Sequence, residues 1–529
     1  MATDKPRSFH AKVCVMMAAT VLLLSACSSE AKRVVLFSVP HVANVRTHTN
    51  VGRALTALGH EAYVCIPQFM LDEKMVNVDG VSVVPYGDYL GNVEELFFGK
   101  SIEKIWNRES VGVSHMINFF QAMKEMVRKI LGDEALESRL RSLEPDLFVI
   151  TNFPPFKNFV ILPYKLDVPF VYMSPFNDLP SQRVPFSPSA TACPISASFS
   201  NEGMTLVDRL KTAVCNVMIL IMDQLVLDDS MVSEFAPQRP QISVEAIQMK
   251  AELYIVESDH VLDFAKPELP SMKLIGCTAP IPAKPLKEPF KSFVDSAPRG
   301  VAVVTFGSSV VNLPPDVSDK MASAFLQQDL HVVWRVNLSS PDPVKILTSK
   351  WVPQNDILGH PNTKLFISHC GANGQYESVY HGVPMLCLPL VGDQFYNAQR
   401  SKSKGFGLTG SIMDLTDKEL ADLMRKITQN ETFRSNVKKA SELFRLLYKV
   451  PAESAALWID HVMEYGGTYM RSAGQLMPMY QFLMLDVLGV VSLSCLLALL
   501  VVFGLLRCCF RLGRKICGRK QSSRKSKKD

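Results

Sequence analysis

The sequence predicts an α/β fold with two doubly wound domains that face a cleft, followed by one C-terminal transmembrane helix. Three observations support this. A chain of 529 residues is long enough for two large domains and accessory segments. Apolar runs typical of buried parallel strands alternate with helix-compatible segments in both halves. Near the end, residues 487–506 contain no charge over twenty positions, which is the length of a membrane-spanning helix.

Residues 1–29 have the features of a cleaved signal peptide. The first residues are mostly basic, and the apolar run at 13–24 is too short to cross a bilayer. Small residues follow that run. The sequence LSAC at 24–27 also fits a bacterial lipoprotein cleavage box, but the segment at 487–506 favours the secretory interpretation.

A first domain is expected at residues 30–279. It opens with a strand, a helix and a second strand, which is the βαβ arrangement. Further apolar runs predict more buried strands before the domain closes. These strands are expected at 33–39, 62–66, 146–150 and 168–172, with 255–276 as the closing segment.

Within this domain, residues 214–227 are unusually apolar for an amphipathic helix. Two interpretations stay open. The segment is either a core helix or a membrane-facing helix that admits apolar molecules.

Prolines without clear periodicity mark residues 280–299 as a linker. The second domain, at 300–465, repeats the alternation of strands and helices, and 466–486 form a juxtamembrane segment. Basic residues crowd the C-terminal side of the transmembrane helix at 487–506, so the tail at 507–529 is expected in the cytosol and the domains on the lumenal side.

The tail also accounts for the positive net charge. The chain has a net charge of +5, and the tail holds ten Lys/Arg and one Asp, so the rest has 46 basic and 50 acidic residues, a net charge of −4. Nothing in this distribution of charge suggests a nucleic-acid partner, and none is expected. Lys525 and Lys527 resemble the dilysine retrieval signal of endoplasmic reticulum membrane proteins, although a basic tail bound to anionic lipid is the alternative.

The cysteines and histidines indicate neither a disulfide scaffold nor a metal site. Six of the twelve cysteines lie in the expected lumenal part, too few for a disulfide-built fold. No Cys/His spacing predicts zinc. Cys508 and Cys509 are candidates for palmitoylation, and Asn337 and Asn430 begin glycosylation tripeptides.

The most informative stretch is residues 351–400. An apolar strand at 364–368 is followed by His369, Gly371 and Gly374, and then by a helix-compatible run. Glycines at a strand-to-helix switch let backbone amides approach a ligand, and the helix N-terminus favours an anion such as a diphosphate. Taken alone, this loop also fits an ordinary tight turn.

The whole stretch resembles the donor-binding signature of UDP-glycosyltransferases, in particular the membrane-anchored, UDP-glucuronosyltransferase-like members. The resemblance implies two Rossmann-like domains of the GT-B type, and it implies a role for each matching residue. Trp351 and Gln354 would bind the uracil, and His369 the phosphates. Glu377 would take the ribose hydroxyls, and Asp393 and Gln394 the sugar hydroxyls. The cofactor-binding positions it implies are Ser308, Trp351, Gln354, His369, Gly371, Asn373, Gly374, Glu377, Asp393 and Gln394.

Two positions in the signature depart from the family. Cys370 replaces the usual glycine, which is tolerable next to a diphosphate only if its backbone angles suit a residue with a side chain. Ala372 replaces a small hydroxylated residue, so one phosphate contact is expected to be weaker.

The resemblance also implies a metal-independent, inverting displacement that uses no cofactor besides the UDP-sugar donor. The family's base is a histidine after the first strand, oriented by an aspartate; here Asn44 and Asn152 occupy these positions. We therefore expect His41 to serve as the base, with Asn152 orienting it through a hydrogen bond but not through charge. His48 is a second candidate, and His41 as an ordinary loop histidine stays open.

The expected function is transfer of glucuronic acid or glucose to small lipophilic acceptors by a single-pass protein of the endoplasmic reticulum membrane. Two alternatives stay open. One is a galactosyltransferase that forms glycolipids. The other is a UDP-sugar-binding partner with impaired catalysis, which Asn44 and Asn152 favour. Homo- or hetero-oligomers are compatible with either.

Overall fold

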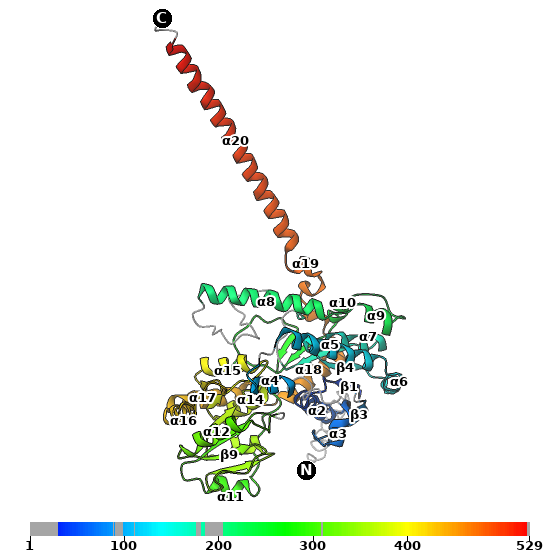
Figure 1. Cartoon of the computed structure of the whole chain (residues 1–529). Helices are drawn as coiled ribbons and strands as arrows, with labels where there is room; N and C mark the ends of the chain where they lie inside the picture. Colours follow the sequence, from blue (N-terminus) through cyan, green and yellow to red (C-terminus); the bar gives the residue numbers. More distant parts are fainter. Residues whose placement is uncertain are drawn as a thin grey trace, which may run out of the picture. The chain divides into compact units, whose positions relative to one another are not determined.

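The computed structural model describes residues 30–87, 89, 99–109, 112–175, 181–185, 205–307 and 310–525. The expected signal peptide, Ser308 and Lys527 lie outside these residues. The chain divides into two compact units, Met1–Arg471 and Ser472–Asp529, which are considered separately (Figure 1).

The first unit contains a seven-stranded parallel sheet with the order β3-β2-β1-β4-β5-β6-β7. Its central strands are buried on both faces, as expected for a parallel sheet covered by crossover helices. The strands are β1 (Arg33–Phe37), β2 (Glu61–Pro67), β3 (Ser82–Tyr86), β4 (Leu147–Thr151), β5 (Phe170–Ser174), β6 (Tyr254–Val256) and β7 (Met272–Leu274).

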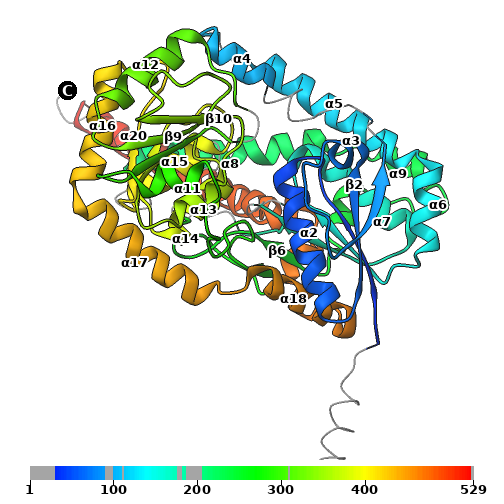
Figure 2. The same ribbon diagram turned by 90° about the horizontal axis from the view of Figure 1, so that it is seen from below.

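Helices cover both faces of this sheet (Figures 1 and 2). They are α2 (Val42–Ala57), α3 (Gln68–Asp72), α4 (Lys100–Trp106), α5 (Val113–Leu131), α6 (Glu134–Ser142), the 3-10 helix η2 (Pro154–Val160), α7 (Ile161–Leu166), α8 (Leu206–Val226), α9 (Ser230–Phe235) and α10 (Val244–Gln248).

A second parallel sheet of six strands has the order β10-β9-β8-β11-β12-β13. The two sheets confirm the predicted pair of doubly wound domains. The strands are β8 (Val301–Thr305), β9 (His331–Arg335), β10 (Ile346–Ser349), β11 (Thr363–Ser368), β12 (Met385–Cys387) and β13 (Gly407–Thr409). The helices are α11 (Phe290–Asp295), α12 (Pro315–Leu326), α13 (Gln354–Leu358), α14 (Ala372–His381), α15 (Gln394–Ser403), α16 (Asp417–Gln429) and α17 (Glu431–Leu447).

The chain crosses back to the first sheet through α18 (Pro451–Tyr465). Ala455, Ala456 and Ile459 are fully buried in the core that α2 forms with β1, and Figure 2 shows α18 beside α2. From the sequence, this helix was expected to belong to the second domain, at 300–465. The structure differs because its apolar face fits the surface of the first sheet, which sequence periodicity does not identify.

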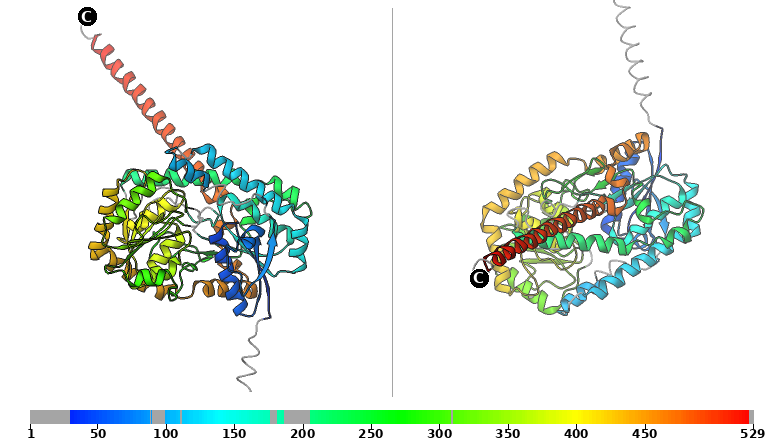
Figure 3. Two further views of the ribbon diagram at one scale, coloured as in Figure 1. Left: turned by 60° about the horizontal axis from the view of Figure 1, so that its bottom comes forward. Right: turned by 90° about the horizontal axis from the view of Figure 1, so that it is seen from above.

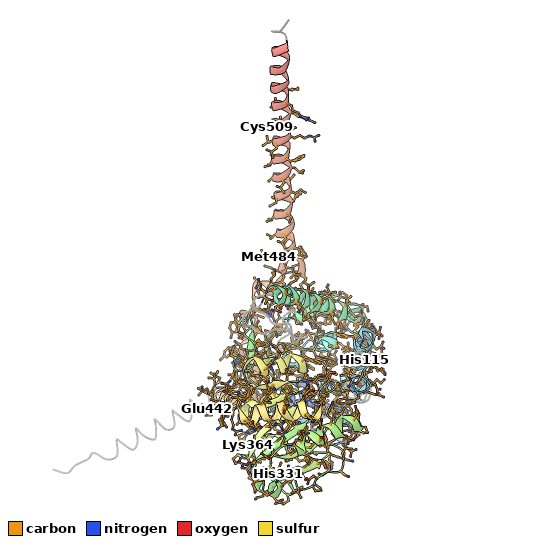
Figure 4. All side chains as sticks on the ribbon, turned by 60° about the vertical axis from the view of Figure 1, so that its left-hand side comes forward. His115, His331, Lys364, Glu442, Met484 and Cys509 are labelled. Atoms are coloured by element: carbon orange, nitrogen blue, oxygen red, sulfur yellow. A yellow bond between two sulfur atoms is a disulfide. The ribbon has the colours of Figure 1, made fainter. Side chains whose placement is uncertain are left out.

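The described part of the second unit consists of the 3-10 helix η4 (Ala473–Leu476), α19 (Met479–Phe482) and the long helix α20 (Leu485–Lys525), whereas the 3-10 helix η3 (Thr468–Met470) ends the first unit. Residues Leu485–Lys515 are long and apolar enough to cross a membrane, and none of this segment is buried. The segment contains the expected span at 487–506. Side chains such as Cys509 are exposed along it (Figure 4). This helix is a candidate membrane anchor.

Candidate functional site

Neighbouring strands of the second sheet bring the diphosphate-loop candidates together. β11 pairs with β8 on one side and with β12 on the other, all parallel. Their carboxyl ends therefore lie at one edge, where Gly307 follows β8 and His369 follows β11. The helix α14 starts directly after this loop, so its free amides face the same edge.

Two glycines make room for the ring of His369. A Cβ atom would lie 2.6 Å from its Nε2 at Gly307 and 2.7 Å from it at Gly371, closer than any side chain allows. Gly307 also has φ +77°, which favours glycine. Burial, helped by the charge of Arg335, lowers the pKa of His369 to about 4, so the imidazole is neutral at physiological pH. A neutral ring can still donate one N–H to a phosphate oxygen.

Arg335 was not singled out in the sequence, although it ends β9 beside β8. Its guanidinium donates hydrogen bonds to the carbonyl of Gly307 and, at 3.0 Å, to that of Lys350. It thus places a fixed positive charge close to His369. The available signal was an arginine at the carboxyl end of a neighbouring strand.

Gln354 and Glu377 meet through a short hydrogen-bond chain. Thr305 at the end of β8 donates to the Gln354 carbonyl, and the Gln354 amide donates to the Glu377 carboxylate. Glu377 is only 8% exposed, and burial raises its pKa to about 7. The sequence spacing predicted neither this direct bond nor the part played by Thr305.

Trp351 precedes α13, and Asn373 and Gly374 lie with Glu377 on α14. Trp351 is 66% exposed, which rules out a core role and leaves its ring free to stack on a base. A Cβ at Gly374 would lie 3.2 Å from the Gln354 amide nitrogen. The side-chain oxygen of Asn373 lies 3.8 Å from the sulfur of Cys277. Cys277 belongs to the segment that follows β7 of the first sheet.

Asp393 and Gln394 begin α15 but differ in their surroundings. The Gln394 carbonyl oxygen accepts from the backbone amides of Leu390 and Val391, so it holds the preceding loop. Asp393 is exposed and accepts a 2.7 Å hydrogen bond from Asn397. Although the residue as a whole is exposed, protein packed against its carboxyl group disfavours the charged form and raises its pKa. The hydrogen bond from Asn397 opposes this rise most, and a weaker electrostatic influence of His41 acts in the same sense as Asn397.

His41 immediately precedes α2, with an extended backbone. Asn152 follows β4, which pairs with β1, and is 1% exposed. Neither atom of the Asn152 amide has a hydrogen-bond partner, so the expected bond between Asn152 and His41 is not formed.

His48 is unsuited to be a base for an external hydroxyl. It is buried within α2, and its Nδ1 donates to the carbonyl of Asn44 at 2.9 Å. Its Nε2 lies 3.5 Å from the Thr151 hydroxyl. Burial lowers the pKa of His48 to about 4.

The departure at Cys370 has an unexpected form. The residue has φ 60°, in the left-handed region that disfavours a side chain, and it forms a disulfide with Cys387 at the end of β12. The backbone angles therefore do not suit a side chain, contrary to the condition stated from the sequence. The bridge ties the loop after β11 to the neighbouring strand.

Two hydrogen bonds fix the helices of the site against the first domain. Tyr376 on α14 donates to Asp259 at 2.7 Å, and Tyr396 on α15 donates to Asp263 at 2.6 Å. All four side chains are buried. The elements that carry Glu377 and Asp393 are thus held by the segment that follows β6.

Comparisons with known proteins agree with this geometry. The family model described as "UDP-glucoronosyl and UDP-glucosyl transferase" matches residues 34–523. UDP-glucuronosyltransferase 1A1 of Mus musculus is 31% identical over 69% of this chain and 68% of its own length. UDP-glucuronosyltransferase 2B13 of Oryctolagus cuniculus is 28% identical over 98% of this chain and 99% of its own.

Solved structures show the same fold at lower identity. The glycotransferase of kitacinnamycin has a TM-score of 0.59 at 18% identity and covers 82% of this chain and 100% of its own. A UDP-glucosyltransferase from Polygonum tinctorium capable of glucosylating indoxyl has a TM-score of 0.56 at 16% identity, covering 82% and 99%.

Proposed function

Because this chain belongs to the family of UDP-glucuronosyl and UDP-glucosyl transferases, we propose that it transfers glucuronic acid or glucose from a UDP-sugar to small lipophilic acceptors. The observation that carries the proposal is the chain from Thr305 through Gln354 to Glu377, beside the neutral His369. It presents amide and carboxylate groups next to an anion-binding loop, as a nucleoside diphosphate requires.

In the proposed mechanism, the second domain binds the donor. Trp351 stacks on the uracil, Gln354 bonds its edge, and Glu377 accepts from the ribose hydroxyls. The loop of His369 and Gly371, together with the α14 amides, takes the diphosphate. As the bond to the anomeric carbon breaks, these donors and the charge of Arg335 stabilise the leaving UDP without requiring a metal ion.

The acceptor hydroxyl attacks the anomeric carbon from the opposite side and inverts it. We assign His41 as the base that takes the hydroxyl proton, because it lies between the carboxyl end of β1 and the start of α2 and interacts electrostatically with Asp393, which would hold the donor sugar. Asn152 lies nearby but does not orient His41 in the structure. The first domain supplies the acceptor side in this scheme.

A binding-only function is the second candidate. It is favoured by the unpartnered amide of Asn152 and by Asn44, which cannot accept the proton. In that case the protein would bind UDP-sugars as a partner of active relatives.

The location proposed is the endoplasmic reticulum membrane. The long apolar helix α20 would cross it once, with the domains in the lumen and the basic tail in the cytosol.

Full-length protein in lipid nanodiscs, supplied with labelled UDP-glucuronic acid, UDP-glucose or UDP-galactose, separates these functions. Phenols, amines and lipids serve as acceptors, and mass spectrometry detects products. We expect product with one of the first two donors, and its loss in Glu377→Ala. UDP binding without product from any donor supports the binding-only function. Absence of both contradicts the proposed site.

A further inference from the structure

The helix α8 has the reverse of the usual amphipathic arrangement. Its two buried residues, Thr212 and Asp223, are polar. Its large apolar residues are exposed instead, several of them by more than half. These are Leu206, Val207, Leu210, Val214, Val217, Met218, Ile221 and Leu225. Figures 1 and 3 show α8 along the outside of the first unit.

The exposed residues form one stripe opposite the buried ones. At about 100° per residue, Thr212 and Asp223 point in directions only about 20° apart. All eight exposed apolar residues point within about 70° of the direction opposite to the mean of these two. Exposed single apolar residues are common, but a continuous stripe along six turns of helix indicates an apolar partner.

The polar face is tied to the domain. Asp223 forms an ion pair with Lys157 of η2, and both side chains are buried. Asn158 donates to the carbonyl of Val226 at 2.9 Å and accepts from the amide of Asp228 at 2.8 Å. Residues Leu206–Phe235 are long and apolar enough to span a membrane, but crossing it would break this pair and leave two charges unpaired.

The occupant that fits the stripe is a lipid bilayer rather than a second copy of the chain. The candidate anchor α20 begins at Leu485, and only residues 472–484 separate it from the first unit. Lipid is therefore always within reach, whereas a second copy has to be met by diffusion. Lys211 is exposed beside the stripe, where its amine can reach lipid phosphates.

We propose that α8 lies in the membrane interface, with its apolar stripe among the headgroups and upper acyl chains and its polar face on the domain. The proposal depends on α20 as the anchor and not on transferase activity. It gives the first domain a second attachment to the membrane and a defined orientation toward it.

Cleavage of the full-length protein tests the proposal. A protease site is inserted between Arg471 and Ser472, the protein is reconstituted into liposomes of phosphatidylcholine and phosphatidylserine, and then cleaved. Flotation should show the first unit still bound to the liposomes. In the triple variant Leu210→Gln, Val214→Gln and Ile221→Gln, binding should fall by about tenfold or more, since burial of one such side chain already corresponds to that factor.

The matched control changes exposed leucines on α17. Leu443, Leu446 and Leu447 are exposed to a similar degree, and the neighbouring Glu442 lies at the surface in Figure 4. The corresponding triple glutamine variant should bind liposomes like the unchanged protein. UDP affinity and melting temperature of both variants verify folding.

If the α8 variant misfolds, the unchanged full-length protein is reconstituted with lipids that carry a photoactivatable group in the acyl chain. After irradiation, lipid adducts should map to α8 as well as to α20 but not to α17. Complete release of the unchanged first unit after cleavage overturns the proposal. Cross-links from α8 to a second copy, without lipid adducts, also overturn it.

Discussion

If Glu377 binds the ribose as proposed, we expect its carboxyl group to make nucleotide affinity depend on pH. Burial raises its pKa to about 7, and ribose hydroxyls bond best to its charged form. Binding therefore lowers the pKa. Above about pH 7 the group is already charged and affinity is constant; below it a proton must leave first, and affinity falls by up to about tenfold per pH unit. Calorimetry with UDP between about pH 6 and pH 8 measures this.

Glu377→Gln is the control for that titration. It keeps the shape of the side chain but removes the ionisation, so UDP should bind more weakly with a flatter pH profile. The phosphates of UDP titrate in both proteins and cancel in the comparison. The pKa of His369 is about 4, which places it outside the window. An equally steep profile in the variant would assign the pH dependence to another group.

His41→Ala tests the proposed base. Turnover of hydroxyl acceptors should fall by about 10²–10⁴-fold, the usual contribution of a positioned proton acceptor. UDP affinity should hardly change, because His41 belongs to the first domain. Steady-state kinetics and calorimetry on the same preparation separate the two effects.

Restoring the family pattern provides the complementary variant. Asn44→His with Asn152→Asp, introduced into His41→Ala, should recover activity toward hydroxyl acceptors. Amine acceptors need less help from a base and should be least affected by His41→Ala. Full activity of His41→Ala with phenols would show that another group removes the proton.

At the scale of elements, the bridge between Cys370 and Cys387 joins the ends of β11 and β12. It closes a loop with a sequence separation of 17, for which a disulfide contributes about 3 kcal/mol of stability. Cys387→Ala should therefore lower the melting temperature of the second domain by about 6–12 °C, measured by differential scanning calorimetry.

Two further variants test whether loss of the disulfide causes the lower melting temperature of Cys387→Ala. Cys65→Ala removes a buried thiol that forms no disulfide, and it should lower the melting temperature much less. Adding Cys370→Gly to Cys387→Ala should recover about 1 kcal/mol, because glycine adopts the left-handed backbone without strain. If Cys387→Ala and Cys65→Ala lower the melting temperature by the same amount, the disulfide does not stabilise the loop.

The elements also show what the sequence could and could not predict. Long apolar runs with clear turns predicted the central strands, but the short edge strands β3 and β13 lack such a signal. The family resemblance implied that Gln354 and Glu377 serve the same nucleotide, but it did not predict the direct hydrogen bond between them, which depends on how α13 and α14 pack. The sheet that α18 covers and the isolation of Asn152 depend on contacts between distant segments, which no local pattern contains.

For the whole molecule, the tail should determine where the protein resides. Lys525 and Lys527 match a retrieval signal, and the uncharged span 487–506 within α20 is kept when the chain ends at Leu506. The shortened protein should leave the endoplasmic reticulum for later compartments while staying in the membrane, as fluorescence microscopy and carbonate extraction can show. The double variant Lys525→Ser with Lys527→Ser should also leave the endoplasmic reticulum. The control variant Arg511→Ser with Arg514→Ser should stay there. Reticular staining of the shortened protein would count against the signal.

The return of α18 to the first sheet affects how the protein is made. His60 before β2 bonds to Asp460 on α18 at 3.1 Å, across 400 residues of sequence. At about 5–20 residues per second, the ribosome needs roughly 20–80 s to supply that helix after His60. Throughout this interval the apolar side of α2 is uncovered. The nascent first domain must therefore wait, incomplete, for the last part of the chain, and a product that terminates before Pro451 presents a permanent surface for chaperones.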